Sequence, residues 1–227
     1  MGKTAALILA AGKSTRMQAD VPKQFMEVLG KPLFMHSVLT YLPLVDQVVL
    51  VTNKEAVEEV RETLRSFLPD TLIPVVEGGE ERYDSSWNGI KYLEQAGGYD
   101  LVMIHDAARA FVTKEVIQRA MDEAKASGTA VAAVPSKDTI KIARKDGTVI
   151  DTPDRRTLYA VQTPQAFSLS LILEAFRRFF EEKERNPELE VTDDASLVER
   201  FTDHPVRLVR GDYGNLKITT PEDLKGL

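Results

Sequence analysis

Near its beginning the chain reads Leu7-Ile8-Leu9-Ala10-Ala11-Gly12-Lys13-Ser14-Thr15-Arg16-Met17, and Pro22-Lys23-Gln24 follows shortly after. The apolar run is typical of a buried strand, and the small residues behind it permit a tight loop. Backbone N–H groups in such a loop can approach a phosphate, while Lys13, Arg16 and Lys23 neutralise its charge. We therefore predict an anion site here and expect a nucleoside triphosphate as its ligand. The alternative is an ordinary strand-to-helix turn with solvated cations.

Two better-known phosphate-binding motifs do not fit this loop. A P-loop needs a glycine five residues before its Gly-Lys pair, and residues 7–11 contain none. A dinucleotide fingerprint needs glycines where Ser14 and Met17 stand. The predicted phosphate site is therefore of another type.

The length and composition of the chain favour one large α/β domain over residues 1–227. Of the 227 residues, 43% are hydrophobic, which is enough for a sizeable core. The 35 acidic residues outnumber the 29 basic ones, and the formal net charge of -6 argues against a general nucleic-acid surface. Phosphate binding must then come from local cations.

The sequence contains no cysteine. This excludes disulfides, thiolate catalysis and cysteine-ligated metal, and it is compatible with a reducing cytosol. The apolar run before Gly12 is too short to span a membrane, and the N-terminus lacks the layout of a signal peptide. We therefore expect a cytoplasmic protein with no membrane partner.

Short β-rich runs alternate with segments of helical periodicity. Buried strands are predicted at 6–9, 48–52, 72–76, 101–104 and 130–134, and apolar helix faces near 57–67 and 116–124. The alternation indicates βαβ units and a Rossmann-like, mostly parallel sheet flanked by helices. Such sheets bind ligands at the carboxyl ends of their strands, where the loops 11–24 and 105–109 lie.

The alternation breaks between residues 137 and 162. Residues 139–143 alternate in polarity, Lys145-Asp146-Gly147 signals a turn, and residues 148–150 resume the alternation. We predict an inserted β-hairpin, which has too little surface of its own to bury and is expected to pair with a second subunit. The chain would then form a homodimer through this arm.

The remaining segment is predicted to return to helices and strands. A helix face runs from Leu171 to Phe179, a second helix follows Thr192, and a last strand spans 206–209. Residues 215–219 alternate like an edge strand, and Thr220-Pro221-Glu222-Asp223 is typical of a helix start.

The third core strand leads into Gly78-Gly79-Glu80-Glu81-Arg82-Tyr83-Asp84-Ser85-Ser86, which precedes a helix carrying Trp87. Paired glycines permit unusual φ values or the close approach of a planar ligand. A plain left-handed turn before a capped helix remains the alternative. The position beside the first loop favours a binding loop.

The fourth core strand ends in His105-Asp106-Ala107-Ala108-Arg109. An aspartate in this position is a common Mg²⁺ ligand, because the cation takes oxygen ligands and keeps its substrate phosphates. His105 is interpreted as a core histidine, and an ion pair between Arg109 and Asp106 remains an alternative. His36 and His204 have no partner spacing and are interpreted as structural.

Two further motifs have good structural explanations. In Gln162-Thr163-Pro164-Gln165 the proline can fix the return from the hairpin. In Thr192-Asp193-Asp194 the threonine and two acids can cap a helix. We prefer the structural interpretation for both, and Lys217 alone would be a solvated strand residue.

Taken together, the chain resembles the 2-C-methyl-D-erythritol 4-phosphate cytidylyltransferases of isoprenoid biosynthesis. The similarity runs from Ala6 to Leu224 and consists of an ordered set of motifs: Ala10-Ala11-Gly12 with Arg16-Met17, Pro22-Lys23-Gln24, Gly78-Gly79 with Arg82 and Ser85, His105 to Arg109, Asp138-Thr139 with Lys141, Arg155, Gln162 to Gln165, Thr192 to Asp194, and Asn215 with Lys217 and Thr219. Each motif is weak alone, but the ordered set is specific.

The resemblance implies a cytidylyl transfer in which the phosphate of methylerythritol phosphate attacks the α-phosphorus of CTP and pyrophosphate leaves. It implies that Arg16 and Lys23 act on the pentacoordinate phosphorus and the departing pyrophosphate. Lys217 then contacts the α-phosphate, and Asp106 serves Mg²⁺, or another divalent cation, and both substrates. The implied nucleotide pocket consists of Ala10, Ala11, Gly12, Lys13, Gly79, Arg82, Ser85 and Asp106.

The resemblance also implies how the acceptor is held. Residues that match Thr139 and Arg155 bind the methylerythritol phosphate in the neighbouring subunit's site, and Arg109 contributes to substrate binding. Arg156 is adjacent to Arg155, and the spacing of eight residues before Thr163 favours Arg155. The hairpin exchanged across a dimer would explain the insertion.

The chain departs from the family pattern at Ser14, Glu80 and Ala110, where glycine, aspartate and proline are usual. These changes affect backbone stiffness more than charge. Two other functions stay open: a cytidylyltransferase for ribitol 5-phosphate and a non-catalytic nucleotide-binding domain. Ala108 favours methylerythritol phosphate, since the sister family tends to have valine there. Arg16, Lys23, Asp106 and Lys217 together argue against mere binding.

Overall fold

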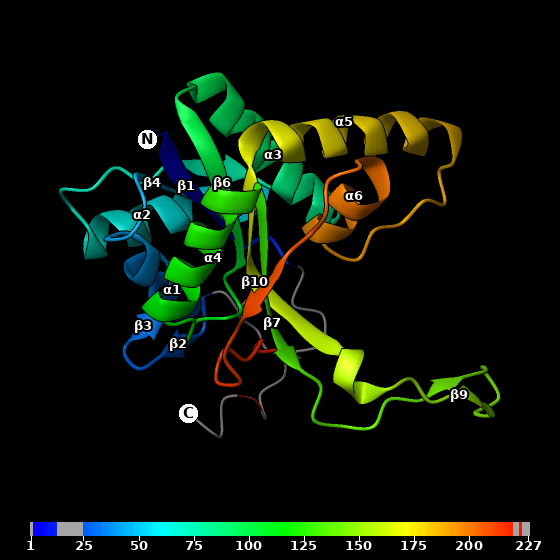
Figure 1. Cartoon of the computed structure of the whole chain (residues 1–227). Helices are drawn as coiled ribbons and strands as arrows, with labels where there is room; N and C mark the ends of the chain where they lie inside the picture. The colour runs from blue at the N-terminus through cyan, green and yellow to red at the C-terminus, as the bar shows by residue number, and fades with distance from the viewer. Residues whose placement is uncertain (1, 13–24, 220–222, 224–227) are drawn as a thin grey trace.

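A computed structural model describes residues 2–12, 25–219 and 223 of the chain. Its centre is a seven-stranded sheet (Figure 1). In sheet order the strands are β11 (Leu208–Arg210), β7 (Thr129–Pro135), β10 (Tyr159–Ser168), β6 (Tyr99–Asp106), β1 (Lys3–Leu9), β4 (Gln47–Thr52) and β5 (Val75–Glu77). Within the described sheet β10 alone runs antiparallel to its neighbours, so the expected mostly parallel α/β architecture is confirmed.

Helices cover both faces of the sheet and create two hydrophobic cores. One core lies under α1 (Leu33–Tyr41), α2 (Val57–Phe67) and α4 (Lys114–Ser127), and the other under α3 (Arg82–Ala96), α5 (Leu169–Arg185) and α6 (Asp194–Phe201). Strand β1 serves both cores, because Ile8 faces the first and Leu7 faces the second. Continuous apolar runs are therefore required in the central strands, as the sequence predicts.

Local chemistry determines where the helices begin and end. The side chain of Thr113 accepts a hydrogen bond from Val116 N at the start of α4, and Gly128 ends that helix with φ of 86°. At the start of α3, Glu81 and Asp84 form a reciprocal capping box. This box fixes the first turn of the helix that carries Arg82 and Ser85.

Four short strands and two 3₁₀ turns complete the described structure. Strands β2 (Glu27–Val28) and β3 (Lys31–Pro32) form a small hairpin, and the 3₁₀ turns are η2 (Lys54–Ala56) and η3 (Arg155–Thr157). Strands β8 (Ile142–Ala143) and β9 (Val149–Asp151) pair antiparallel in a separate two-stranded sheet.

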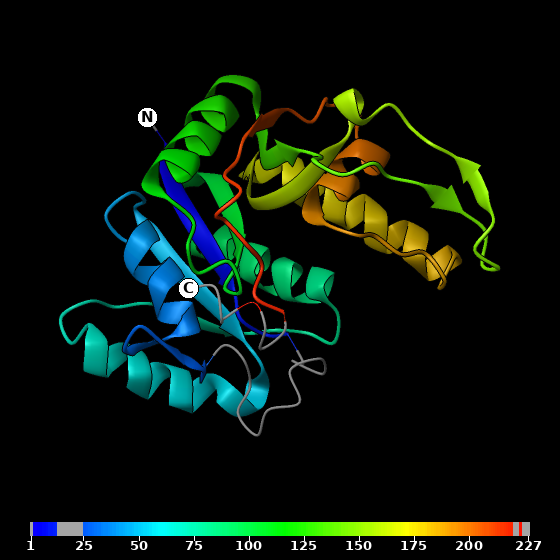
Figure 2. The same ribbon diagram turned by 90° about the horizontal axis from the view of Figure 1, so that it is seen from below.

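The hairpin between residues 137 and 162 is therefore confirmed, and it extends away from the central sheet (Figures 1 and 2). Its turn is built as expected: Gly147 has φ of 87°, and Asp146 Oδ1 accepts a hydrogen bond from Thr148 N. Between residues 137 and 161 every residue except Pro153 and Leu158 is exposed. Residues 159–161 of this range already belong to β10 and pair with β7, whereas residues 138–157 bury little surface against their own chain.

Strand β10 was not expected from the sequence. It occupies the middle of the sheet and contains Pro164, a residue that is normally excluded from central strands because it cannot donate to the ladder. The structure accommodates the proline where the register of β10 against β7 shifts between Val161 and Gln165. Pro164 therefore lies inside a strand and does not simply end the hairpin.

The prediction of an edge strand at residues 215–219 is wrong. This segment is irregular, because Ile218 N donates to Ala108 O and the Asn215 side chain is buried against β10. Two other strands begin two or three residues later than predicted, at Val75 and Leu208. Of the predicted helix start at 220–223, residues 220–222 lie outside the described part of the chain.

Among the described residues, no helix is both long enough and apolar enough to cross a membrane.

Candidate functional site

The candidate site lies where β1 and β6 end. Leu9 pairs with Asp106 in the parallel ladder, so residues 10–12, the described start of the first loop, and the His105–Arg109 loop leave the sheet side by side. The Gly78-Gly79 loop joins them, since Gly78 N donates to Thr52 O and Ala10 N donates to Val51 O. The described parts of the loops that the sequence singled out therefore meet at one edge, as expected for ligand sites of α/β sheets.

The two glycines of the second loop are explained by close packing. A Cβ on Gly78 would stand 2.6 Å from the Ala11 Cβ, and one on Gly79 would stand 2.2 Å from the Asp84 Cβ. Neither glycine has a positive φ, so the alternative of a left-handed turn is wrong. Ser85 Oγ accepts a hydrogen bond from Gly79 N at 3.1 Å and fixes the loop on α3.

Asp106 is the centre of an ion-pair network. Its Oδ1 lies 3.1 Å from Arg82 Nε, and its Oδ2 lies 2.6 Å from Lys217 Nζ. Arg82 also reaches a second carboxylate, with Nη1 2.7 Å from Asp194 Oδ2. Asp106 is 8% exposed, so these cations replace much of its hydration. The alternative pairing of Asp106 with Arg109 is not what the structure contains.

The network determines the charge states of its members. Burial alone would raise the pKa of Asp106, but Arg82 and Lys217 outweigh burial and hold that pKa well below its usual range. Burial would lower the pKa of Arg82, but Asp194 and Asp106 hold it above its usual value. Asp106 is therefore ionised and Arg82 cationic throughout the neutral range.

Arg109 connects the loop after β6 to the C-terminal segment. Its Nη1 donates to Asn215 O at 2.7 Å, and its Nη2 donates to Val161 O at 3.3 Å. Asn215 is fully buried, and its Nδ2 donates to Thr163 O at 2.9 Å. Burial lowers the pKa of Arg109, and Asp106 partly opposes this shift. These contacts fix the segment that carries Lys217 beside Asp106.

His105 is a core histidine, as interpreted from the sequence. It is fully buried, its Nε2 lies 3.2 Å from Arg109 O, and its Nδ1 lies 3.0 Å from Thr163 Oγ1. Burial lowers its pKa to about 4, although Asp106 opposes the shift. His36 and His204 bond to the carbonyls of Val28 and Ser127, as expected for structural histidines.

Neutral His105 makes folding sensitive to acid. In the unfolded chain this histidine binds a proton as the pH falls below about 6.5, whereas in the native protein it does so only near pH 4. The free energy of unfolding therefore decreases as the pH falls through this interval. We expect a loss of roughly 2 kcal/mol at pH 5 from this residue. Urea unfolding of ligand-free protein at pH 5 and 7.5 measures it. In His105→Gln this part of the pH dependence should vanish, and an unchanged dependence would assign it elsewhere.

The structure separates two of the three acceptor-binding candidates, Thr139 and Arg155, from Asp106, while Arg109 lies in the same loop as Asp106. Thr139 is in the arm and Arg155 is at its base in η3; both are exposed, and no contact joins either to Asp106, Arg82 or Lys217. Arg156 is engaged by Asp154, at 2.5 Å, whereas Arg155 has one long hydrogen bond, to Lys137 O at 3.4 Å. Arg155 is thus the more available of the two arginines.

Three candidates of the first loop, Lys13, Arg16 and Lys23, lie outside the described residues. Ala10 is buried, Ala11 is half-buried and Gly12 is exposed at the end of β1.

Asp106 offers oxygen ligands of the kind that Mg²⁺ prefers. Each of its oxygens accepts one bond from a cationic side chain, which leaves further lone pairs. No cluster of three or more metal-binding side chains occurs in the part of the chain that the structure describes. Mg²⁺ is commonly held by one or two carboxylates together with substrate phosphates. The donor set therefore fits a cation that arrives with a triphosphate.

Sequence reasoning missed three contributors. Thr163 Oγ1 accepts a hydrogen bond from Asp106 N, Asn215 organises the C-terminal segment, and Asp194 binds Arg82. All three stand in motifs that were noticed but interpreted as structural or as part of a strand. The capping interpretation holds for Asp193, which accepts from Ser196 N, but it does not account for Asp194.

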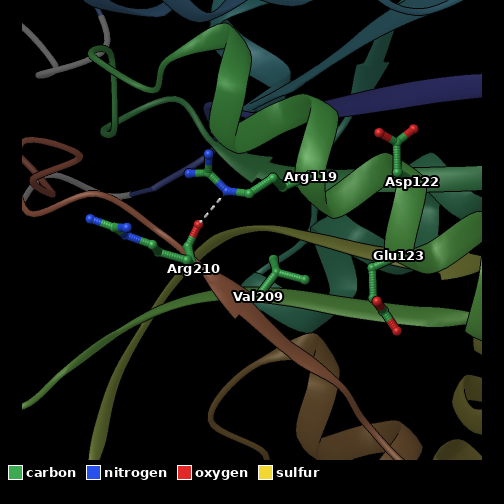
Figure 3. Close-up of a pocket in the computed structure, with 5 residues that line it drawn as sticks. All are labelled: Arg119, Asp122, Glu123, Val209 and Arg210. Atoms are coloured by element: carbon green, nitrogen blue, oxygen red, sulfur yellow. Dashed lines mark hydrogen bonds between the residues drawn. The ribbon is translucent and has the colours of Figure 1, made fainter.

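A separate hollow of about 420 Å³ lies between α4 and β11 (Figure 3). It is lined by Arg119, Asp122, Glu123, Val209 and Arg210. Arg119 Nε donates to Arg210 O across it, at 3.0 Å. It contains none of the predicted site residues and mixes both signs of charge.

Comparison with known proteins gives consistent matches. A model of the family described as 2-C-methyl-D-erythritol 4-phosphate cytidylyltransferase matches residues 4–226. Proteins of that name from Lachnospira eligens and Caldanaerobacter subterraneus are 41% and 43% identical to this chain, over 97% and 96% of it and 95% and 94% of their own lengths. The crystal structure of 4-diphosphocytidyl-2C-methyl-D-erythritol synthase from Anaerococcus prevotii superposes with a TM-score of 0.86 at 31% identity, over 99% of this chain and 96% of the other.

Proposed function

This chain belongs to the 2-C-methyl-D-erythritol 4-phosphate cytidylyltransferase family, and we propose that the residues around Asp106 carry out the family's reaction. The chain converts CTP and 2-C-methyl-D-erythritol 4-phosphate to 4-diphosphocytidyl-2-C-methyl-D-erythritol and pyrophosphate. The convergence of Arg82 and Lys217 on the Asp106 carboxylate at the end of β6 supports the assignment. It gathers, at one sheet edge, the charges that a triphosphate and its cation require.

The reaction needs no general base from the protein. A phosphate monoester has a second pKa of about 6, so the acceptor is largely a dianion at neutral pH. Its oxygen attacks the α-phosphorus of CTP, a new P–O bond forms, and the bond to the leaving pyrophosphate breaks. His105, the histidine nearest to Asp106 in the chain, is buried and neutral, in keeping with a mechanism of positioning and charge stabilisation.

Lys217 is proposed to contact the α-phosphate. Its side chain is 40% exposed, so it has room to leave the Asp106 carboxylate when a nucleotide arrives. Arg16 and Lys23 are proposed to stabilise the pentacoordinate phosphorus and the departing pyrophosphate.

Asp106 is proposed to hold Mg²⁺, or another divalent cation, together with the phosphates of CTP. When bound, this cation supplies positive charge that offsets the charge of the triphosphate. Within the chain, Thr163 orients Asp106 by accepting from its backbone N–H, and Arg82 orients its carboxylate.

The nucleotide pocket is proposed to consist of residues 10–13, Gly79, Arg82, Ser85 and Asp106. The first loop and the Gly78-Gly79 loop pack closely here, since a Cβ on Gly78 would stand 2.6 Å from the Ala11 Cβ and 2.8 Å from Ser85 Oγ. Cytosine presents an amino donor where uracil presents an acceptor, so a carbonyl and a hydroxyl in the Gly79 to Ser85 loop can distinguish them.

The chain is proposed to be a single nucleotidyltransferase domain that dimerises through the arm at 137–162. The arm and the adjoining start of β10 expose large apolar side chains, which a second copy would cover. They are 43–57% exposed: Ile140, Ile142, Val149 and Ile150 in the arm, and Tyr159 and Val161 in β10. Thr139, Arg155 and Arg109 are proposed to hold the acceptor, the first two in the partner's site. A cytoplasmic location is also proposed, in keeping with a chain that has no cysteine.

An assay of pyrophosphate release tests the function. We expect release from CTP, Mg²⁺ and methylerythritol phosphate, and none with ribitol 5-phosphate as the acceptor. Release with ribitol 5-phosphate alone would support the sister activity, and release with neither would contradict both. Chelation by EDTA should stop the reaction and added Mg²⁺ should restore it, since the cation is proposed to enter with CTP. Activity that survives chelation would contradict the proposed metal at Asp106.

A further inference from the structure

Asp194 is the one carboxylate of the Arg82 network that the reaction has not used. It is the first residue of α6 and is fully buried, with its Oδ2 2.7 Å from Arg82 Nη1. Its Oδ1 is buried without a hydrogen-bond partner among the described residues. A buried carboxylate is costly to keep, so its retention calls for a physical reason.

Stabilising α6 is not a sufficient reason. The capping of that helix belongs to Asp193, whose Oδ1 accepts from Ser196 N at 3.0 Å in a reciprocal box. The start of α6 is also attached to β10 by Gln165, which accepts from Ala195 N at 2.9 Å and donates to Asp193 Oδ2 at 2.8 Å. Asp194 instead directs its oxygen away from its own helix, to α3.

Arg82 connects Asp194 to Asp106 at the centre of the site. The guanidinium is planar, so the N–H bonds of its Nη1 and Nε have fixed directions relative to each other. Since Nη1 binds Asp194 and Nε binds Asp106, the position of Asp194 determines which edge of Arg82 faces Asp106. Strand β10 supports both carboxylates, through Gln165 at the start of α6 and through Thr163 at Asp106 N.

We infer that Asp194 is a positioning residue for nucleotide binding, which holds Arg82 in place and thereby orients the Asp106 carboxylate. The inference rests on the proposed function of Asp106 and Arg82. Without the Asp194 charge, Arg82 is free to turn both of its N–H edges to Asp106 or to the triphosphate. Either movement changes the orientation of the Asp106 carboxylate and of Arg82 to which CTP binds.

The test compares two neighbouring aspartates in the full-length enzyme. Asp194→Asn removes the charge that holds Arg82. The matched control Asp193→Asn weakens the cap of α6 and the bond from Gln165, but it leaves the Asp194 charge beside Arg82 in place. CTP binding is measured by calorimetry without acceptor, kcat and KM by pyrophosphate release, and the melting temperature by circular dichroism. We expect Asp194→Asn to raise both Kd and KM for CTP about tenfold or more, the scale typical of supporting residues. Asp193→Asn should lower the melting temperature by a few degrees and leave both constants within about twofold.

A double-mutant cycle assigns the effect to Arg82. In an Arg82→Met background, adding Asp194→Asn should change the Kd for CTP by less than about twofold, because no guanidinium remains to be held. An equal loss in both backgrounds, or wild-type binding in folded Asp194→Asn, would overturn the inference. Should Asp194→Asn not fold, Asp194→Glu takes its place: it keeps the charge but shifts it, and normal CTP binding in that variant would equally contradict the positioning role.

Failure of the proposed function would be distinguishable. An enzyme that released no pyrophosphate in the wild-type form would contradict the reaction, while calorimetry with CTP alone would still measure the coupling of Asp194 to Arg82.

Discussion

Replacement of Lys23 by alanine will lower kcat by about two to three orders of magnitude, and Arg16→Ala will have a similar effect. Both cations are proposed to stabilise charge that develops only as the α-phosphorus becomes pentacoordinate and pyrophosphate departs. A group that acts mainly in the transition state affects kcat, whereas a group that only binds CTP affects KM. The expected loss is therefore in kcat at saturating CTP.

Steady-state kinetics at saturating Mg²⁺ measures this loss. Lys54→Ala is a matched control, because Lys54 is an exposed lysine that also follows a strand of the sheet, β4. It should keep kcat within about twofold of the wild type. Near-normal turnover in Lys23→Ala or Arg16→Ala would remove the assigned role from that residue. A large rise in KM with unchanged kcat would assign it to ground-state binding instead.

Mixing two inactive variants, Arg155→Ala and Lys23→Ala, will restore activity to about a quarter of the wild-type level. The proposed dimer places Arg155 of one chain in the site that contains Lys23 of the other. After random exchange about half of the dimers are hybrids, and each hybrid contains one intact site and one doubly mutated site. Each parent alone lacks an intact site.

Subunit exchange must be verified separately, by differently tagged chains that co-purify after mixing. With exchange verified, absence of recovery would contradict the action of Arg155 across the interface. Arg156→Ala provides the comparison, because Asp154 already engages that arginine. If the Arg156 variant loses acceptor binding and Arg155→Ala does not, the assignment passes to the neighbouring residue.

The parts of the fold that follow from periodicity were predictable. The run Leu7-Ile8-Leu9 predicts a buried strand, and the apolar face of α5 predicts an amphipathic helix. Both predictions are right because the same residues are buried in the folded core. Strand β10 was hidden because Pro164 argues against a central strand, and a register shift that accommodates it is a property of the assembled sheet. Residues 215–219 misled for the opposite reason. Their alternation comes from Leu216 and Ile218, but Leu216 is 54% exposed whereas Ile218 is buried, so the two do not share one face of a strand.

The residues of the candidate site likewise include some that the sequence predicts and some that it does not. Asp106 was predictable, since an aspartate at the end of an apolar strand has few structural reasons to be there. Asp194 and Thr163 were not, because a helix start and a turn explain them locally, and only the folded chain brings them to Arg82 and Asp106. Buried polar partners from distant segments leave no periodic signal.

Strand β10 begins at the base of the arm and ends at α5, and along the way it contacts both halves of the site in its own chain. Val161 accepts from Arg109, and Thr163 accepts from the backbone of Asp106. The arm is therefore continuous with the strand that positions Asp106 in its own chain. In the proposed dimer, the segment that enters the partner's site would continue directly into the strand that holds Asp106 in its own site, so each chain would contribute to two reaction centres through one strand.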